Sequence, residues 1–234
     1  MVSEAVISII SKLVKSIPRD KRGPVDTKPI SHYLDKIIYV LETGIPWRKL
    51  VLSSDDLHYT SYHKKFLYLR NNFVFQRAYD IIIQIMKKLN YFDSSKINNL
   101  YVDASMIKNY YGSDSTGPNH YDRGRSGNKI SVVVTDSGIP LGIKISTSNI
   151  HDSTLLVGTL DKIKITIAKS RIIADKGYVG RRLKNTLKTN YDVDLVTPLK
   201  KNQVETTQYT ENYELLSKRN IVENFFSWLK HKQN

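Results

Sequence analysis

The stretch SRIIADKGYVGRRL, residues 170–183, decides the fold of this 234-residue chain. Its apolar run IIA, residues 172–174, carries no charge, which is typical of a strand buried on both faces of a sheet. Asp175 follows at the carboxyl end of this run, and Gly177 permits a tight turn before a helical pattern begins. Ligands bind at that edge of open α/β sheets. An acid placed there needs a partner or a metal ion, because burying a lone charge is costly.

Two further segments each place one acid in a comparable setting. YVDAS, residues 101–105, is a second apolar strand pattern and carries Asp103, whereas RNIVENFFSWLK, residues 219–230, is a helical pattern and carries Glu223. The segments between Asp103 and Asp175 predict that their two strands lie side by side at the centre of the sheet. Three carboxylates on two strand ends and one helix are what a site for two divalent metal ions needs.

The last helix is predicted to have one polar and one apolar face. At about 100° per residue, Arg219, Glu223 and Lys230 share a face. The opposite face carries Ile221, Val222, Phe225, Trp228 and Leu229. Such a polar face is compatible with plain solvated surface, but an acid flanked by two cations fits a phosphodiester site better. We therefore expect Glu223 to converge with the two strand acids, and burial of Phe225 and Trp228 to anchor the helix.

The order of the expected elements indicates the fold. Strands are expected in LYVDASMI, ISVVVTDSG, PLGIKIST, RIIADKGY and DVDLVTPLK, and helices at 152–163, at 179–189 and from 218 to the end. Asp136–Gly138, followed by a proline, predicts a hairpin turn between the second and third strands, and a loop is expected before the last helix. Together with the positions of the acids, this order resembles the α/β ribonuclease-H-like fold, a mixed sheet flanked by helices.

Residues 1–92 show helical patterns and no clear strand pattern, which predicts a small all-helical domain before a second domain at 98–234. Helices are expected at 1–16, 31–43, 58–71 and 73–89. Ser31 is the expected N-cap of the second helix, Gly44 its expected stop, and Trp47 is expected to anchor the following turn in a core.

The net charge of +14, from 36 Lys and Arg against 22 Asp and Glu, makes a polyanionic partner the first expectation. An AT-rich genome would also raise the Lys count without any function. The placement of the charge favours nucleic acid, because Arg123, Arg125 and Lys129 interleave with Gly and Ser, and such clusters supply contacts to backbone phosphates.

Several classes of protein do not fit the sequence. No apolar run approaches the twenty residues of a transmembrane helix, and no secretory signal is expected. There is no cysteine, hence no disulfide or thiolate metal site, and no P-loop or GxGxxG motif indicates a nucleotide cofactor. We expect an intracellular protein without a membrane partner, cytoplasmic or nucleoid-associated if bacterial. Asp152 fits a helix N-cap better than a catalytic role.

The combined motifs resemble those of insertion-sequence DDE transposases of the insertion-sequence-four and -five superfamily. That family carries one Asp in a motif like VDAS, a second in a motif like ADKGY, and a Glu in the helical signature Tyr, two residues, Arg, three residues, Glu, six residues, Lys. Arg219, Glu223 and Lys230 match this spacing, whereas Leu216 stands at the Tyr position. KPISHYLDKIIYVLETGIPWRKL, RGRSGNKISVVVTDSGIPLG and NIHDSTLL are also similar to the family, so the resemblance covers almost the whole chain.

The resemblance implies DNA transposition by metal-dependent cleavage and strand transfer. Asp103, Asp175 and Glu223 would hold two Mg²⁺ or Mn²⁺ ions, and Arg219 and Lys230 would position the phosphate. The helical domain would help to recognise double-stranded element ends, with target DNA as a further partner and a homodimer in the DNA complex left open. Members of this family continue the last helix well beyond Lys230, so the catalytic domain looks C-terminally short. Two alternatives therefore stay open: a catalytically impaired, truncated relic that only binds DNA, and a ribonuclease-H-like nuclease of another role.

Overall fold

The computed structural model describes residues 3–18, 26–91, 99–108, 116–118, 124, 126–199 and 207–231. The chain divides into two compact units, a helical unit of residues 1–88 with 229–234 and a sheet unit of residues 89–228. Arg123 and Arg125, two of the predicted DNA contacts, lie outside the described residues.

The helical unit follows the predicted helical patterns. Its described elements are α1 (Glu4–Ser16), α2 (Ile30–Thr43), the short 3-10 turn η1 (Trp47–Lys49), α3 (Tyr59–Asn71) and α4 (Val74–Lys88). Gly44 ends α2 in the left-handed conformation with φ 67°, as predicted, because glycine adopts positive φ without steric cost. The predicted N-cap was wrong: Pro29 occupies that position, and Ser31 lies inside the first turn of α2.

A single apolar core stabilises the helical unit. Fully buried side chains from α2, α3 and α4 form its centre, among them Leu34, Ile37, Leu69 and Val74. Trp47 is partly buried against this core, and its ring centroid lies 5.6 Å from that of Phe66. The predicted anchoring of this turn by Trp47 is therefore confirmed.

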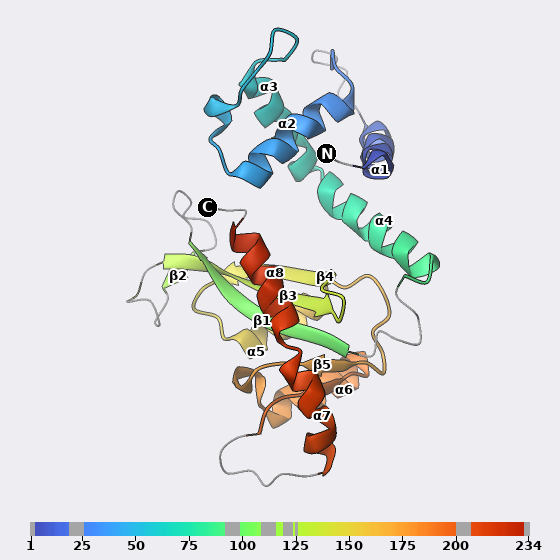
Figure 1. Cartoon of the computed structure of the whole chain (residues 1–234), viewed down its shortest axis with the longest axis vertical. Coiled ribbons are helices and arrows are strands. Elements are labelled where there is room, and N and C mark those ends of the chain that lie inside the picture. The colour runs from blue at the N-terminus through green and yellow to red at the C-terminus, as the bar shows by residue number, and fades with distance from the viewer. Residues whose placement is uncertain are drawn as a thin grey trace. The chain divides into compact units, whose positions relative to one another are not determined.

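The sheet unit alternates strands and helices. Its described elements are β1 (Asn99–Lys108), β2 (Gly117–Pro118), β3 (Ser126–Thr135), β4 (Pro140–Thr147), α5 (Asp152–Leu160), β5 (Arg171–Ile173), η2 (Lys176–Tyr178), α6 (Arg181–Tyr191), β6 (Asp194–Val196), α7 (Thr207–Ser217) and α8 (Asn220–His231). The strand order is β2-β3-β1-β5-β6, with β4 also paired to β3 (Figure 1).

This topology is ribonuclease-H-like, as predicted. β1, β3 and β4 pair antiparallel, and β5 and β6 then add in parallel, each after a helix. Gly138 closes the predicted β3–β4 hairpin with φ 78°. Because β1 and β5 are inner strands, Val102, Ile172 and Ile173 are fully buried, which explains why their segments are almost purely apolar.

Two predictions about the C-terminal part were wrong. α7 occupies a segment expected to be a loop, since its polar-rich sequence TQYTENYELLS has no sustained apolar stripe. On α8, Val222 and Phe226 are the buried side chains, whereas Trp228 is 58% exposed. The helix is therefore rotated from the predicted orientation, because the row Arg219–Val222–Phe226 also has helical spacing and is the row that faces inward.

α5 packs unusually closely on β4. A Cβ at Gly142 would lie 2.6 Å from the Thr159 carbonyl oxygen of α5, so only glycine permits this approach. The Thr159 hydroxyl donates to Ser131 Oγ on β3 at 2.9 Å, which fixes the helix along the sheet. These two contacts hold the C-terminal part of α5 against β3 and β4.

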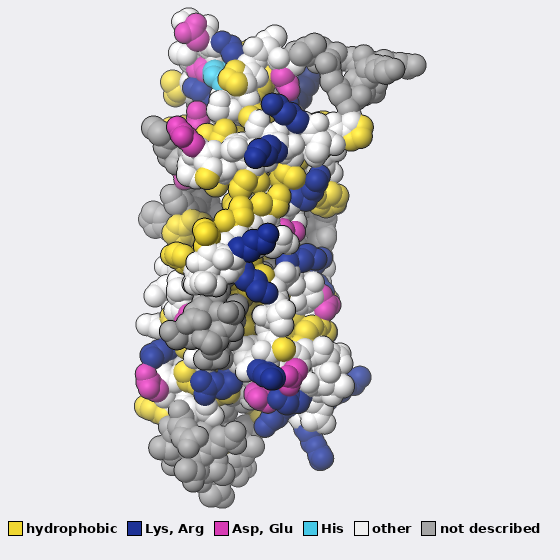
Figure 2. Space-filling view, turned by 90° about the vertical axis from the view of Figure 1, so that its right-hand side faces the viewer, with side chains coloured by type: hydrophobic (Ala, Val, Ile, Leu, Met, Phe, Trp, Pro, Cys, Tyr) yellow, Lys and Arg dark blue, Asp and Glu magenta, His cyan; other side chains and the backbone are white. Residues whose placement is uncertain are grey.

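The surface agrees with the basic composition. Lys and Arg side chains are scattered over the visible face in Figure 2, among hydrophobic and acidic side chains. No helix in the described ranges is long and apolar enough to cross a membrane.

Candidate active site

The parallel pairing of β1 and β5 brings Asp103 and Asp175 to equivalent positions. Leu100 pairs with Ile172 and Tyr101 with Ile173, and each acid lies two residues beyond the latter pair. Since side chains alternate with period two and adjacent strands lie about 4.8 Å apart, the two acids leave the sheet on the same side. Asp103 is in the middle of β1 rather than near its end, whereas Asp175 follows β5 and caps η2.

The backbone partly satisfies both carboxylates. Asp103 Oδ1 accepts a hydrogen bond from the Ala104 N–H at 2.8 Å, and Asp175 Oδ1 accepts one from the Lys176 N–H at 2.5 Å. Burial raises the pKa of the Asp103 carboxyl above its usual range, and the negative charges of Asp152 and Asp175 raise it further. Asp103 therefore lies where a cation would be favourable.

Arg219 connects the last helix to these acids. Its Nη1 donates to Asp175 Oδ1 at 3.4 Å, and its positive charge lowers the pKa of Asp103 against the larger effect of burial. The Arg219 side chain is only 19% exposed, and its Nε–H is buried without a hydrogen-bond partner. An unpaired guanidinium N–H beside two carboxylates is a donor available to an anionic ligand.

Glu223 lies one turn after Arg219 on α8 and is exposed. Within the described parts of the chain, no group of three or more His, Asp or Glu residues is close enough to hold a metal ion. Of the predicted site residues, the structure brings together Asp103, Asp175 and Arg219. Lys230 is exposed on the last turn of α8, and its segment groups with the helical unit.

Lys129 points into the sheet unit. Its Nζ donates to Asp152 Oδ1 at 2.7 Å and to the Ile150 carbonyl at 2.8 Å, and its side chain is only 14% exposed. The cation that was predicted to contact DNA is therefore engaged internally.

Asp152 is the first residue of α5 rather than its N-cap. The cap is His151, whose Nδ1 accepts a hydrogen bond from the Ser153 N–H at 3.3 Å. The N-cap prediction was wrong by one residue, because a neutral imidazole nitrogen can accept the bond that a carboxylate usually takes.

Tyr178 is the residue of this region that the sequence analysis missed. It ends η2, three residues after Asp175, and is 1% exposed. Its hydroxyl is buried without a hydrogen-bond partner. Burial raises the pKa of the Tyr178 hydroxyl, and the charges of Asp152, Asp103 and Asp175 add to this, so the hydroxyl stays neutral and able to donate. The position of Tyr178 directly after the residues ADKG was the feature of the sequence that could have indicated its place near Asp175.

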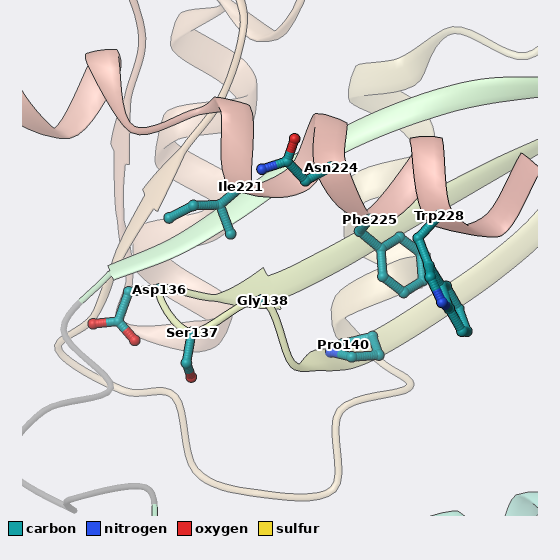
Figure 3. A pocket seen from close by; sticks show the side chains of 8 residues that line it. All are labelled: Asp136, Ser137, Gly138, Pro140, Ile221, Asn224, Phe225 and Trp228. Atoms are coloured by element: carbon teal, nitrogen blue, oxygen red, sulfur yellow. The ribbon is translucent and has the colours of Figure 1, made fainter. Parts of the chain in front are cut away.

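A separate apolar groove of about 560 Å³ lies between the β3–β4 hairpin and α8 (Figure 3). Phe225 and Trp228 extend from α8 toward Pro140, and Ile221 lies over the hairpin. Neither Asp103 nor Asp175 lines this groove. Phe225 and Trp228 therefore form a partly open apolar surface instead of the expected buried anchor.

The donor set suits a hard divalent cation. Two carboxylates at equivalent positions of neighbouring strands supply oxygen ligands of the kind that Mg²⁺ and Mn²⁺ prefer. The raised pKa of Asp103 and the unpaired donors on Arg219 and Tyr178 indicate that the free protein leaves this site incompletely satisfied.

A family model described as transposase DDE domain matches residues 94–234, which is more than half of the chain. Among solved structures, the piggyBac transposase in a synaptic complex with hairpin DNA is similar with a TM-score of 0.40 and 14% identity, covering 90% of this chain and 51% of that one. The Mos1 transposase in a paired-end complex with the left transposon end has a TM-score of 0.32 and 10% identity, covering 95% and 84%. The chain spans about half the length of the piggyBac chain. No curated protein sequence matched.

Proposed function

The chain belongs to the transposase DDE domain family, and from that premise we propose that it is an insertion-sequence DNA transposase that cleaves element ends and transfers the strands in a metal-dependent reaction. The observation that carries the proposal is the β1–β5 register, which aligns Asp103 and Asp175, together with the Arg219 contact to Asp175.

Each of the site residues has a distinct role in this proposal. Asp103 and Asp175 would hold two Mg²⁺ or Mn²⁺ ions, with Glu223 as the third carboxylate ligand. Such ions would supply the charge that activates the attacking oxygen and stabilises the leaving oxygen. Arg219 uses its unpaired Nε–H to orient the scissile phosphate. Bound cations would favour the charged form of Asp103, whose pKa burial raises in the free protein.

The remaining cations would contact DNA away from the reacting phosphate. Lys230, Arg123 and Arg125 are proposed backbone-phosphate contacts, and the helical unit is proposed to recognise double-stranded element ends. The net charge of +14 supports such contacts, because each neutralised phosphate releases a counterion. Target DNA is the second proposed partner, in a complex that two copies of the chain would build.

The test compares Asp175→Asn with Asp136→Asn, which removes an exposed carboxylate in the β3–β4 turn. The substrate is a supercoiled plasmid carrying the coding sequence with its natural flanks. We expect Asp175→Asn to lose Mg²⁺- or Mn²⁺-dependent nicking while keeping wild-type gel-shift affinity, and Asp136→Asn to keep both. Unchanged nicking by pure Asp175→Asn protein contradicts the assignment.

A second candidate function is DNA binding without cleavage. It is favoured by one observation, namely that the described residues bring no third acid close enough to Asp103 and Asp175 to complete a metal site. The same assay separates the two functions, since a protein that only binds DNA shifts the plasmid fragments in gels but leaves the plasmid intact at every Mn²⁺ concentration.

A further inference from the structure

Among the described α-helices of the helical unit, α3 alone contains no acidic residue. The neighbouring helix α2 exposes Asp35 and Glu42 to solvent. Asp56, which precedes α3, is buried and paired with Lys36, so it adds little negative charge to the surface. From Asp56 to Asp80 the sequence has no other acid, and its cations there are Lys64, Lys65, Arg70 and Arg77. The surface of α3 is therefore positive, which suits the phosphates of DNA.

One face of α3 carries polar side chains to the surface. At about 100° per residue, Lys64, Tyr68 and Asn71 lie within about 60° of one another, and all three are exposed. The opposite face carries Tyr62 and Leu69, which are fully buried in the core of the helical unit. The helix is thus held by its apolar side, beside α2 (Figure 1), and presents a lysine, a tyrosine and an asparagine to solvent.

Neighbouring side chains orient two members of this polar face. Arg70 donates to Asn71 Oδ1 from Nε at 3.2 Å and from Nη2 at 3.1 Å. These bonds engage the carboxamide through its oxygen and leave its N–H donors for another acceptor. Lys65 Nζ lies 5.2 Å from the centroid of the Tyr68 ring, and the ring is still 37% exposed. Side chains that are already oriented lose less entropy when they bind a partner.

Two further cations lie beside α3. Arg48 and Lys49 are exposed on η1, which packs against α3 through the rings of Trp47 and His63, with centroids 5.2 Å apart. Loops beside a helix that enters a DNA groove contact the phosphate backbone. The connection at 44–58 is much longer than the turn of about three or four residues in a helix-turn-helix, so no such motif marks this arrangement in the sequence.

We propose that α3 enters the major groove of double-stranded element ends, where Lys64 and Asn71 read base edges while Arg48, Lys49 and Tyr68 contact backbone phosphates. The major groove is about 12 Å wide and admits an α-helix. Lys64 donates to O6 and N7 of a guanine, and Asn71 donates to N7 of a second purine. Because Asn71 follows Lys64 by two helical turns, about 10 Å, the two purines lie roughly three base pairs apart. This inference rests on the proposed function and names the helix that gives it sequence specificity.

The first experiment selects DNA with the full chain in EDTA, so that binding is measured without cleavage. The probe is a library of duplexes with a randomised centre. We expect the wild type to select a motif that contains two purines about three base pairs apart. Lys64→Ala should lose discrimination at one purine and Asn71→Ala at the other, by about 5- to 100-fold, with the rest of the motif retained. Gln84→Ala removes an exposed carboxamide from α4, and as the matched control it should keep the whole motif.

The second experiment tests the contacting atoms. Replacing the purine assigned to Asn71 by its analogue with carbon in place of N7 removes the acceptor. Wild-type binding should weaken about 5- to 100-fold, whereas Asn71→Ala should bind both duplexes equally.

The phosphate contacts have a different signature. Arg48→Ala should weaken binding to selected and scrambled duplexes by the same factor and reduce the dependence of log affinity on log salt concentration by about one unit of slope. Lys12→Ala makes the same change of charge at an exposed position of α1 and should leave the slope unchanged. Equal salt slopes for Arg48→Ala and the wild type would remove η1 from the interface.

The outcomes separate this inference from the proposed function. A wild-type chain that selects no motif, or a motif that Lys64→Ala and Asn71→Ala both keep, overturns the inference. Loss of the motif in Gln84→Ala also overturns it, because α4 would then be the reading helix. Should a variant of α3 melt below the wild type, the N7 analogue with wild-type protein decides, and undiminished binding overturns the inference. The proposed function fails separately, if Asp175→Asn nicks plasmid like the wild type.

Discussion

Asp56 in the helical unit and Asp103 in the sheet unit are both shielded from water, but donors surround Asp56, whereas burial and then the charges of Asp152 and Asp175 disfavour the ionised form of Asp103. The Asp56 side chain is 3% exposed and accepts hydrogen bonds from Lys36 Nζ at 2.7 Å, the Ser53 N–H at 2.8 Å and the Tyr62 hydroxyl at 3.0 Å. The Lys36 contact, with these other bonds, holds the pKa of Asp56 well below its usual range. Asp103 shows the opposite shift, because burial beside Asp152 and Asp175 raises its pKa.

The difference separates two uses of a carboxylate. The charge of Asp56 is fully satisfied within the fold, so ionisation of Asp56 stabilises the folded protein. Among the described residues, no cation forms an ion pair with Asp103. Two buried donors of this region, Tyr178 Oη and Arg219 Nε, have no hydrogen-bond partner. Asp56, which stabilises the fold, has its hydrogen-bond partners within the protein. Asp103, which we propose binds a ligand, has its carboxylate satisfied only in part in the free protein.

The largest expected effect comes from Asp103→Asn. Plasmid nicking in Mn²⁺ should fall at least about 1000-fold, as expected when a ligand of the reacting metal is removed. Stability without metal should stay equal or rise, because repulsion with Asp152 and Asp175 disappears. Nicking rates and melting temperature on the same preparation check both parts. A large loss of stability would show that Asp103, like Asp56, serves the fold.

Asp56→Asn should lower stability and leave nicking unchanged. Asp56→Asn removes the negative charge and replaces one of the two acceptor oxygens, so that Lys36 and Tyr62 cannot both keep their bonds, which should cost the helical unit about 3 kcal/mol of unfolding free energy. Urea unfolding of the helical unit measures this, and Asp55→Asn, which changes the exposed neighbouring acid, is the control. Nicking per folded molecule of Asp56→Asn should stay at the wild-type level. Equal unfolding free energies of Asp56→Asn and Asp55→Asn would contradict the argument that Asp56 is paired within the fold.

The loss of stability at low pH should reflect protonation of Asp56. A folded pKa below the unfolded one gives stability that is present above the unfolded pKa of 3.8 and is lost as pH falls toward the folded pKa. Lys36, His32, Ser53 and Tyr62 face this carboxylate. The difference in unfolding free energy between wild type and Asp56→Asn should therefore shrink between pH 5 and pH 2. A constant difference would remove the electrostatic explanation.

The smallest effect is expected from Gly142→Ala, which tests how closely α5 packs on β4. The added methyl group meets the Thr159 carbonyl, so α5 must shift, at a cost of about 1–3 kcal/mol. Gly177→Ala meets no atom within 4 Å and should leave stability unchanged. Urea unfolding of the sheet unit compares the two. Equal stability would mean that α5 is not held by the close contact on β4.

The sequence was sufficient for the central strands but not for the partners of side chains. The uncharged run at 172–174 and the repeated acid after a strand predict the β1–β5 neighbours and the alignment of Asp103 with Asp175, because burial on both faces demands such a composition. It could not predict the rotation of α8, since Phe225 and Phe226 are adjacent and either can complete an apolar row. The Lys129–Asp152 pair and the unpaired Tyr178 hydroxyl depend on how α5 docks, which local patterns do not encode.

The most direct test of the central claim is a crystal structure of the wild-type chain grown or soaked in Mn²⁺, with the ions located by anomalous scattering. The account predicts Mn²⁺ bound to carboxylate oxygens of both Asp103 and Asp175, at about 2.0–2.2 Å as expected for a small hard cation. Arg219 should no longer contact Asp175 Oδ1, because the ion takes its place. Crystals that hold no ion at these two carboxylates, at a Mn²⁺ concentration that supports nicking in solution, would contradict it.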